Sequence, residues 1–241
     1  MQIIPLYISK EIEFNDDLPQ LIINSEKIVD KDVLVIAQKI ISKQEGRIVE
    51  LSSITPSLLA EGIGSEYKKD SRIIELILNE SKKIIRMDHG IIIVETNNGF
   101  ICANAGIDES NVKHGFVTLL PVNSDVSAKK ICSEILKKTN KTVSVIISDT
   151  FGRPFRMGQT NFAIGISGMN PILDYGGTRD TFEKTLRVTA IAIADEICSA
   201  AELVMKKTAN CPIVIIRGYK FKNENFSIDN LIRPQDEDLF R

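Results

Sequence analysis

Residues 143–168 read VSVIISDTFGRPFRMGQTNFAIGISG, and this stretch decides how the centre of the chain folds. Its apolar opening is typical of a buried strand, which we expect over residues 141–148, ending at Asp149. An acid, a hydroxyl and two arginines then follow: Asp149, Thr150, Arg153 and Arg156. An acid directly after a buried strand is badly placed for a core and well placed for the rim of a sheet. The stretch therefore raises the hypothesis of a site at the end of a central strand.

Strands and helices are both predicted on either side of this stretch. Apolar runs predict strands over 2–8, 32–40 and 211–219, and two apolar runs around Asn97-Asn98-Gly99 predict a hairpin over 90–106. Helical spacing and capping residues predict helices over 16–28, from Thr55 onward, and over 70–87, 127–141 and 180–207. The charged tail, 225–241, is expected to form a peripheral cap.

Hairpins and helices without a regular βαβ alternation favour an α+β fold, with mixed sheets and packed helices. The chain shows no internal repeat, low-complexity tract or obvious linker. We therefore expect a single domain over residues 1–241, with two intimately packed subdomains as the alternative.

The composition is that of an ordinary globular protein, with 43% hydrophobic and 26% charged residues. A formal net charge of −2 argues against a nucleic-acid partner, because a protein that binds nucleic acid is expected to carry a basic stripe. The N-terminus lacks the pattern of a signal peptide, and no run of 18 apolar residues predicts a membrane span. The four cysteines are widely spaced, which favours reduced, mostly buried thiols. We expect a soluble, cytoplasmic protein.

Asp149 and Thr150 together suit a hard cation such as Mg²⁺ or Mn²⁺, which prefers oxygen ligands. Arg153 and Arg156 could hold carboxylate or phosphate oxygens through bidentate hydrogen bonds. On this segment alone an alternative is equally supported. Asp149 would then cap the following turn, and the arginines would be solvated.

A second acid, Asp108, follows the predicted hairpin and lies three residues before Asn111. Alone, Asp-Glu-Ser-Asn more often forms a turn whose side chains bond their own backbone. Two strand-end acids from separate segments are, however, what a divalent-metal site needs, because one carboxylate holds hydrated Mg²⁺ weakly. Lys43 could reach a phosphate from the turn SKQEGR, although a lysine in a polar turn is usually solvated. Phosphate-loop, dinucleotide and Gly-x-Ser-x-Gly motifs are absent.

Several of these strings occur together, in order, in one known family. They are SKQEGR, NAGIDESN, SDTFGRPFRMGQTNFAIGISG, the helix ADEICSAAELVM and the strand PIVIIRGY. From about residue 30 to residue 219 the chain resembles the coenzyme F420-0:gamma-glutamyl ligases. The resemblance implies an unusual α+β fold that forms an intertwined homodimer. It also implies an amide ligase that joins L-glutamate to the carboxylate of a deazaflavin precursor through an acyl phosphate, releasing GDP and phosphate.

The resemblance also implies roles for single residues. Asp108, Asp149 and Thr150 match the metal ligands of the family, with Asp108 and Asp149 as the catalytic acids. Lys43 and Asn111 match its nucleotide contacts. Two Mg²⁺ or Mn²⁺ ions are implied, K⁺ is a further candidate, and GTP is the cosubstrate. Arg153 and Arg156 have no matching role, and we assign them to acceptor or phosphate binding.

The chain departs from the family pattern on the nucleotide side. The segment Met205–Asn210 contains neither the glycine nor the acid expected after the long helix, and Gln38-Lys39 stands where small hydroxyl residues are usual. The N-terminal loop SKEIEF also lacks the expected apolar, proline-containing pattern. Two alternatives therefore stay open: a paralogous ligase with another acceptor or nucleotide, and a protein that binds nucleotide or deazaflavin without turnover.

Overall fold

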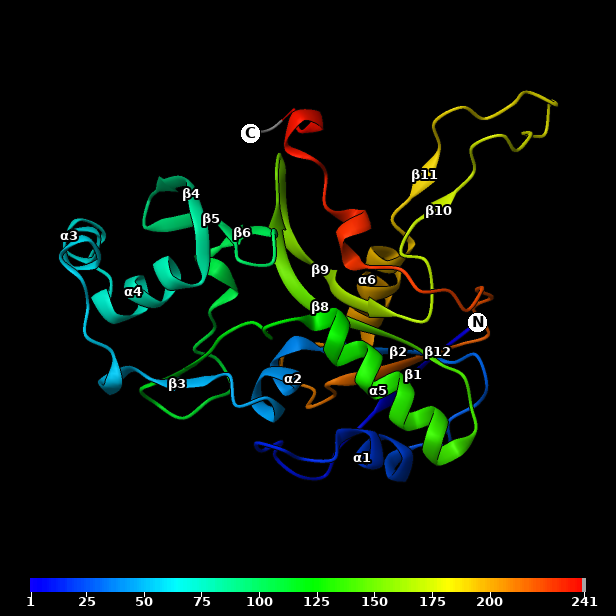
Figure 1. Cartoon of the computed structure of the whole chain (residues 1–241), viewed down its shortest axis with the longest axis horizontal. Helices are drawn as coiled ribbons and strands as arrows, with labels where there is room; N and C mark the ends of the chain where they lie inside the picture. Colours follow the sequence, from blue (N-terminus) through cyan, green and yellow to red (C-terminus); the bar gives the residue numbers. More distant parts are fainter. Residues whose placement is uncertain (240–241) are drawn as a thin grey trace.

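The computed structural model describes residues 1–239, and its centre is a five-stranded mixed sheet (Figure 1). The strand order is β1, β12, β2, β8 and β9, which are Gln2–Leu6, Ile213–Arg217, Val33–Ala37, Ser144–Arg153 and Arg156–Ser167. β2 and β8 run parallel, and the other neighbours are antiparallel. The strands predicted over 2–8 and 211–219 are confirmed, and that predicted over 32–40 ends at Ala37.

Helices cover both faces of this sheet. One face of β2 carries Leu34 and Ile36, which pack with the helices α1 (Leu18–Ser25), α2 (Gln38–Gln44) and α5 (Ser124–Thr139). The other face carries Val33 and Val35, which pack with α6 (Ile193–Met205) and the short helix η3 (Ile228–Leu231). Because consecutive side chains of a strand point to opposite faces, an unbroken apolar strand serves both layers. This burial makes the sheet a rigid support for groups at its edge.

The expected end of the central strand at Asp149 is wrong. β8 continues to Arg153 and turns directly into β9, and the two green strands extend past the rest of the sheet in Figure 1. β2 pairs with β8 only as far as Ser148, whereas β9 pairs with it to the tip. Asp149 is therefore the first residue of β8 with an open edge on the β2 side. The pairing with β9 supplies the backbone hydrogen bonds that let the strand continue.

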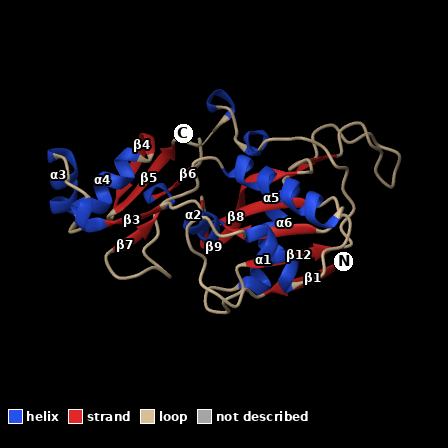
Figure 2. Cartoon of the chain, turned by 60° about the horizontal axis from the view of Figure 1, so that its bottom comes forward, coloured by secondary structure: helices blue, strands red, loops and turns tan. Residues whose placement is uncertain are grey.

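A smaller lobe lies beside the sheet, at the left of Figure 1. It contains the helices α3 (Leu58–Tyr67) and α4 (Ser71–Asn79) and the strands β4 (Ser81–Asp88), β5 (Ile91–Thr96) and β6 (Ile101–Ala103). The pair β5–β6 confirms the predicted hairpin. A two-stranded ribbon, β3 (Ile48–Glu50) with β7 (Phe116–Thr118), and the turn η1 (Leu51–Ser53) join the lobe to the sheet. Figure 2 shows the two parts side by side.

The single helix expected over 70–87 is wrong in its second half. α4 ends at Asn79, and residues from Ser81 onward form β4, which pairs with β5. Ile84 and Met87 on this strand pack against the core of the smaller lobe. Their spacing satisfies a helix, but pairing with β5 offers the same residues a core, so tertiary contacts override the local period.

The helix expected over 180–207 is also too long. Only Ile193–Met205 is helical. The preceding residues form a projecting arm based on β10 (Leu173–Asp174) and β11 (Ala190–Ile191), at the upper right of Figure 1. Polar residues dominate the arm, which therefore lacks the apolar stripe that would hold a helix against the sheet.

The helix predicted over 127–141 is confirmed as α5, which begins earlier, at Ser124. The tail forms η3 and η4 (Gln235–Glu237) along the surface, and residues 240–241 of the predicted cap lie outside the described residues. The four cysteines, all within the described part, form no disulfide, and three of them are buried. Within residues 1–239 no helix combines the length and the apolar character that a membrane crossing requires.

Candidate active site

Asp108 lies in an irregular segment between the turn η2 (Asn104–Gly106) and β7. Its backbone exchanges two hydrogen bonds with Thr118, at 3.1 and 2.9 Å, which fixes it to the edge of β7. Gly106 has a φ of +69° and lies so close to Leu120 that an added Cβ would meet that side chain at 2.8 Å. An added side chain would push Leu120 aside, so glycine suits this turn between β6 and Asp108.

The two carboxylate oxygens of Asp108 have different partners. Oδ1 accepts the backbone N–H of Ser110 at 2.7 Å, which is the local turn considered as the alternative to a site. Oδ2 forms an ion pair with the Nζ of Lys39 at 2.7 Å. Partial burial pushes the pKa of Asp108 upward, but the hydrogen bonds from Lys39 and Ser110 outweigh it, and the pKa lies below its usual range. Asp108 is therefore an ionised carboxylate at neutral pH.

Asp149 is the contrasting acid. Burial raises its pKa to about 6; the Thr150 backbone N–H lowers it, and the negative charge of Asp108 raises it further. The pKa of the neighbouring Cys102 thiol is raised to about 12, mainly by burial and further by the charge of Asp149. Asp149 and Asp108 are thus close enough for their charges to interact, as a metal site with two acids requires. This pair is partly desolvated and lacks full compensation, which fits a divalent cation.

Thr150 begins a chain of polar contacts on the other face of β8. Its hydroxyl donates to Asn161 Oδ1 on β9 at 2.7 Å, and Asn161 Nδ2 donates to Glu202 Oε2 on α6 at 3.1 Å. The ammonium of Lys207 donates to the Thr150 hydroxyl and lies 3.9 Å from Glu202 Oε1. This series of contacts links Thr150 on β8 to the end of α6. Neither Asn161 nor Glu202 stood out in the sequence.

Lys43 lies on α2, which begins where β2 ends. Its side chain is 9% exposed; Nζ donates to the backbone oxygen of Asn111 at 2.8 Å and pairs with Glu11. Lys39 is four residues earlier, and residues four apart share one face of a helix. One helix therefore brings two ammonium groups to the segment 108–111. This spacing was the signal in the sequence that could have indicated Lys39 as a partner of Lys43.

The structure does not bring Arg153 and Arg156 to the acids. They lie opposite each other at the tip of the β8–β9 hairpin. There Arg153 Nη2 donates to Met157 O at 3.1 Å. Arg153 is four residues beyond Asp149, or about 13 Å along a strand. Among the described residues no hydrogen bond or ion pair joins either arginine to Asp108 or Asp149.

The acids supply only part of a metal coordination shell. Within residues 1–239 no group of three or more His, Cys, Asp or Glu side chains converges as metal ligands would. Two carboxylates and a hydroxyl offer oxygen only, which suits Mg²⁺ or Mn²⁺ better than Zn²⁺. Mg²⁺ commonly takes its remaining ligands from water and substrate phosphates, so this donor set is sufficient for that ion.

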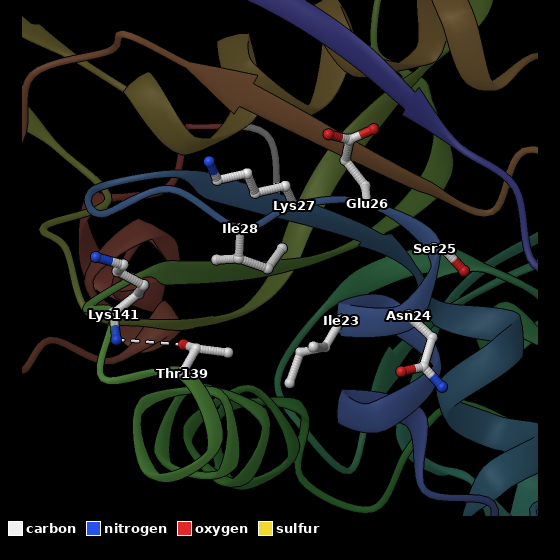
Figure 3. Close-up of a pocket in the computed structure, with 8 residues that line it drawn as sticks. All are labelled: Ile23, Asn24, Ser25, Glu26, Lys27, Ile28, Thr139 and Lys141. Carbon is white, nitrogen blue, oxygen red and sulfur yellow. Dashed lines mark hydrogen bonds between the residues drawn. The ribbon is translucent and has the colours of Figure 1, made fainter.

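Two surface hollows lie elsewhere. Figure 3 shows one between the end of α1 and the end of α5, lined by residues 23–28, Thr139 and Lys141. Its lining, over the part of the chain that the structure describes, includes none of the predicted site residues. A second, polar hollow reaches Phe100, whose ring lies 6.4 Å from that of Phe151 on β8. The candidate site is thus defined by its polar groups on and beside β8.

Comparisons with known proteins show the family of the chain. A model of the F420-0:gamma-glutamyl ligase family matches residues 8–218. The chain is 45% identical over 234 residues to the coenzyme F420:L-glutamate ligase of Methanothermobacter thermautotrophicus, covering 94% of this chain and 93% of that protein. The corresponding ligase of Methanocaldococcus jannaschii is 45% identical over 215 residues, covering 89% and 86%. That of Methanopyrus kandleri is 39% identical over 246 residues, covering 100% and 98%.

These matches define an enzyme, a ligase that forms an amide bond. Within that class, the chain belongs to the F420-0:gamma-glutamyl ligase family, which confirms the resemblance found in the sequence.

Proposed function

We propose that this protein ligates L-glutamate to the free carboxylate of the deazaflavin precursor F420-0, using GTP and a divalent metal ion. The substrate is supported by the relatives, which are named coenzyme F420:L-glutamate ligases. The observation that carries the chemistry is the pair Asp108 and Asp149, flanked by the lysines of α2. Such a site can neutralise two anions, a phosphate and a carboxylate, that otherwise repel each other.

The reaction has two group transfers. A carboxylate oxygen of the acceptor attacks the γ-phosphorus of GTP, the bond to the β–γ bridging oxygen breaks, and GDP leaves. The amine of L-glutamate then attacks the carbonyl carbon of the acyl phosphate, loses a proton, and expels inorganic phosphate. Mg²⁺ or Mn²⁺, when bound, supplies positive charge to the phosphate oxygens.

The chain's own residues have distinct tasks in this scheme. Asp108 and Asp149 would hold the metal from one side of β8, and the Thr150 hydroxyl would offer its oxygen from the other side. Lys43 and Asn111 would contact the nucleotide, with K⁺ as a further ion there. Arg153 and Arg156 would bind the acceptor or its phosphate, from the tip of the hairpin.

We also propose that the enzyme works in the cytoplasm as an intertwined homodimer. Large apolar side chains stand exposed on two projecting elements: Phe155 (89%) and Met157 (95%) at the hairpin tip, and Phe182 and Val188 on the arm. Exposed apolar groups of this kind support burial against a second copy. Sedimentation equilibrium tests this, and a monomer at all concentrations would contradict it.

The function is tested by mass spectrometry of the acceptor. Protein incubated with F420-0, GTP, Mn²⁺, K⁺ and L-glutamate should add one or more glutamyl masses, and omission of GTP should abolish the gain. No gain with an intact acceptor would remove the proposal. Glutamate-dependent release of phosphate with a different acceptor would favour the paralogous ligase, which the unusual segment Met205–Asn210 motivates. Thermal stabilisation by deazaflavin without any product would favour a binding protein.

A further inference from the structure

The end of α6 carries a cation into the candidate site. Lys207 donates a hydrogen bond to the Thr150 hydroxyl and lies 3.9 Å from Glu202. It is also near enough to Asp149 for its charge to lower the pKa of that acid, against the larger effect of burial. An ammonium group thus occupies the place beside Thr150 where the resemblance expects a metal ion.

The Thr150 hydroxyl already takes part in two hydrogen bonds in this arrangement. It donates its hydrogen to Asn161 at 2.7 Å and accepts one from Lys207, which leaves a single acceptor position. Asp149 and Thr150 are consecutive residues of β8, and consecutive side chains point to opposite faces. The carboxylates of Asp108 and Asp149 therefore belong to one side of the strand, and the Thr150–Lys207 contact belongs to the other.

The backbone before Lys207 is strained in a way that holds this arrangement. Lys206 has φ 47° and ψ 169°, in a region that glycine alone enters readily. Its N–H donates to the Glu202 carbonyl at 3.2 Å, so the turn is tied to the last turn of α6. Strain of this kind persists only where surrounding contacts impose it, and here the adjacent contact is the one that Lys207 makes with Thr150.

The charges of the site leave room for one divalent ion. Three carboxylates, on Asp108, Asp149 and Glu202, face two ammonium groups, on Lys39 and Lys207. The cluster therefore has one net negative charge. The neighbouring Lys43 and Glu11 compensate each other. One divalent ion makes the net charge of the cluster positive. A second ion would lie next to the Lys207 ammonium at Thr150, and the two positive charges would repel each other.

We propose that Lys207 is a positioning cation that takes the place of one of the two divalent ions, so that the site binds a single ion at Asp108 and Asp149. This inference rests on the proposed function, since it concerns the same metal site. With a fixed ammonium on one side and one ion on the other, the phosphate oxygens would be neutralised from both faces of β8.

The test is the number of Mn²⁺ ions bound per chain, measured on the full protein from the electron paramagnetic resonance signal of unbound Mn²⁺. Wild-type protein should bind one ion, with and without GDP after correction for the Mn²⁺ that GDP holds in buffer. The variant Lys207→Glu places a carboxylate beside Thr150 and should bind two. The matched control Lys222→Glu changes an exposed lysine outside the site by the same charge and should bind one.

The outcomes separate this inference from the proposed function. Two ions in the wild type, or one in a folded Lys207→Glu, would overturn the role of Lys207 and leave a metal-dependent ligase in place. No ion in the wild type would remove the metal site and both proposals with it. Lys207→Gln keeps the test decisive if Lys207→Glu does not fold. Without the nearby positive charge it should bind its first Mn²⁺ several-fold more tightly, and unchanged affinity would contradict the proposal.

Discussion

Asp108 and Asp149 are the same residue type in one site, yet their environments differ. Asp108 has an ammonium partner, Lys39, and a backbone N–H, and its pKa lies below the usual range despite partial burial. Asp149 is more deeply placed, its pKa is raised by burial to about 6, and its close donor is the Thr150 backbone. We call the two sides of the site the Asp108 wall and the Asp149 wall. The carboxylate charge of the Asp108 wall is compensated by an ion pair before any ligand binds, and that of the Asp149 wall is not.

This difference indicates which wall depends on the ligand. A desolvated carboxylate without an ion-pair partner lowers the stability of the ligand-free protein, and a bound ion removes that cost. The Asp108 wall holds its geometry without help. The Asp149 wall is where binding of an ion should change most.

The largest effect is expected for ligation in Asp149→Asn. The amide keeps the shape but loses the charge that holds the ion, and activity should fall by about 10³-fold, the scale typical of lost electrostatic stabilisation. Initial rates of glutamyl addition measure it. Glu134→Gln, in an exposed helical ion pair, is the matched control and should keep wild-type activity. An active Asp149→Asn would remove the contrast between the two walls.

The stability of the ion-free protein gives the sharpest comparison. Asp149 has a folded pKa above its unfolded value of 3.8, so its ionisation destabilises the folded state as pH rises toward about 6. Asn at this position should increase the free energy of unfolding at pH 7.5 by up to about 3 kcal/mol, and the melting temperature should rise accordingly. The gain should vanish below pH 4.

Asp108→Asn should do the opposite. The folded pKa of Asp108 is lowered, so its charge stabilises the protein above the unfolded pKa and stops doing so as pH falls. The side chain is 39% exposed, and solvent screening makes this change the smaller one. Melting curves of both variants from pH 3 to 8 without metal decide the point. Shifts of the same sign would refute the contrast.

Nucleotide affinity should depend on Lys43, on the compensated wall. Replacing it with Met removes a charged donor while keeping the length, and the Kd for GTP should rise about 10- to 100-fold, as for one lost charged hydrogen bond. Isothermal titration calorimetry measures the change. Lys137→Met removes an exposed lysine paired with Glu134 on α5 and should leave affinity unchanged.

The smallest effect concerns the turn that carries Lys207. Lys206→Gly should stabilise the protein by about 1 kcal/mol, because glycine adopts its backbone angles without strain. Lys68→Gly is a fitting control, since Lys68 lies in the ordinary left-handed region, with φ 53° and ψ 46°, where the gain should be smaller. Urea denaturation compares them. A loss of stability in Lys206→Gly would show that the turn is not strained.

Local patterns predicted much of the fold. Strong apolar runs and Asn-Gly turn chemistry located β1, β12 and the β5–β6 hairpin, because burial and turn geometry depend on adjacent residues. They failed for residues 81–88, which satisfy a helical period but gain their core by pairing with β5. They failed again where β8 continues past Asp149, since that continuation depends on β9.

For the site, the sequence by itself determined the residue types and the family: two acids in separate segments, and strings specific enough to identify related ligases. Only the tertiary structure decided which charges meet. Lys39 reaches Asp108 across 69 residues of chain, and Lys207 reaches Thr150 across 57. The pKa of a carboxylate depends on burial and on charges within a few ångströms, whatever their separation along the chain. Two aspartates that look alike in sequence are therefore different groups in the folded protein.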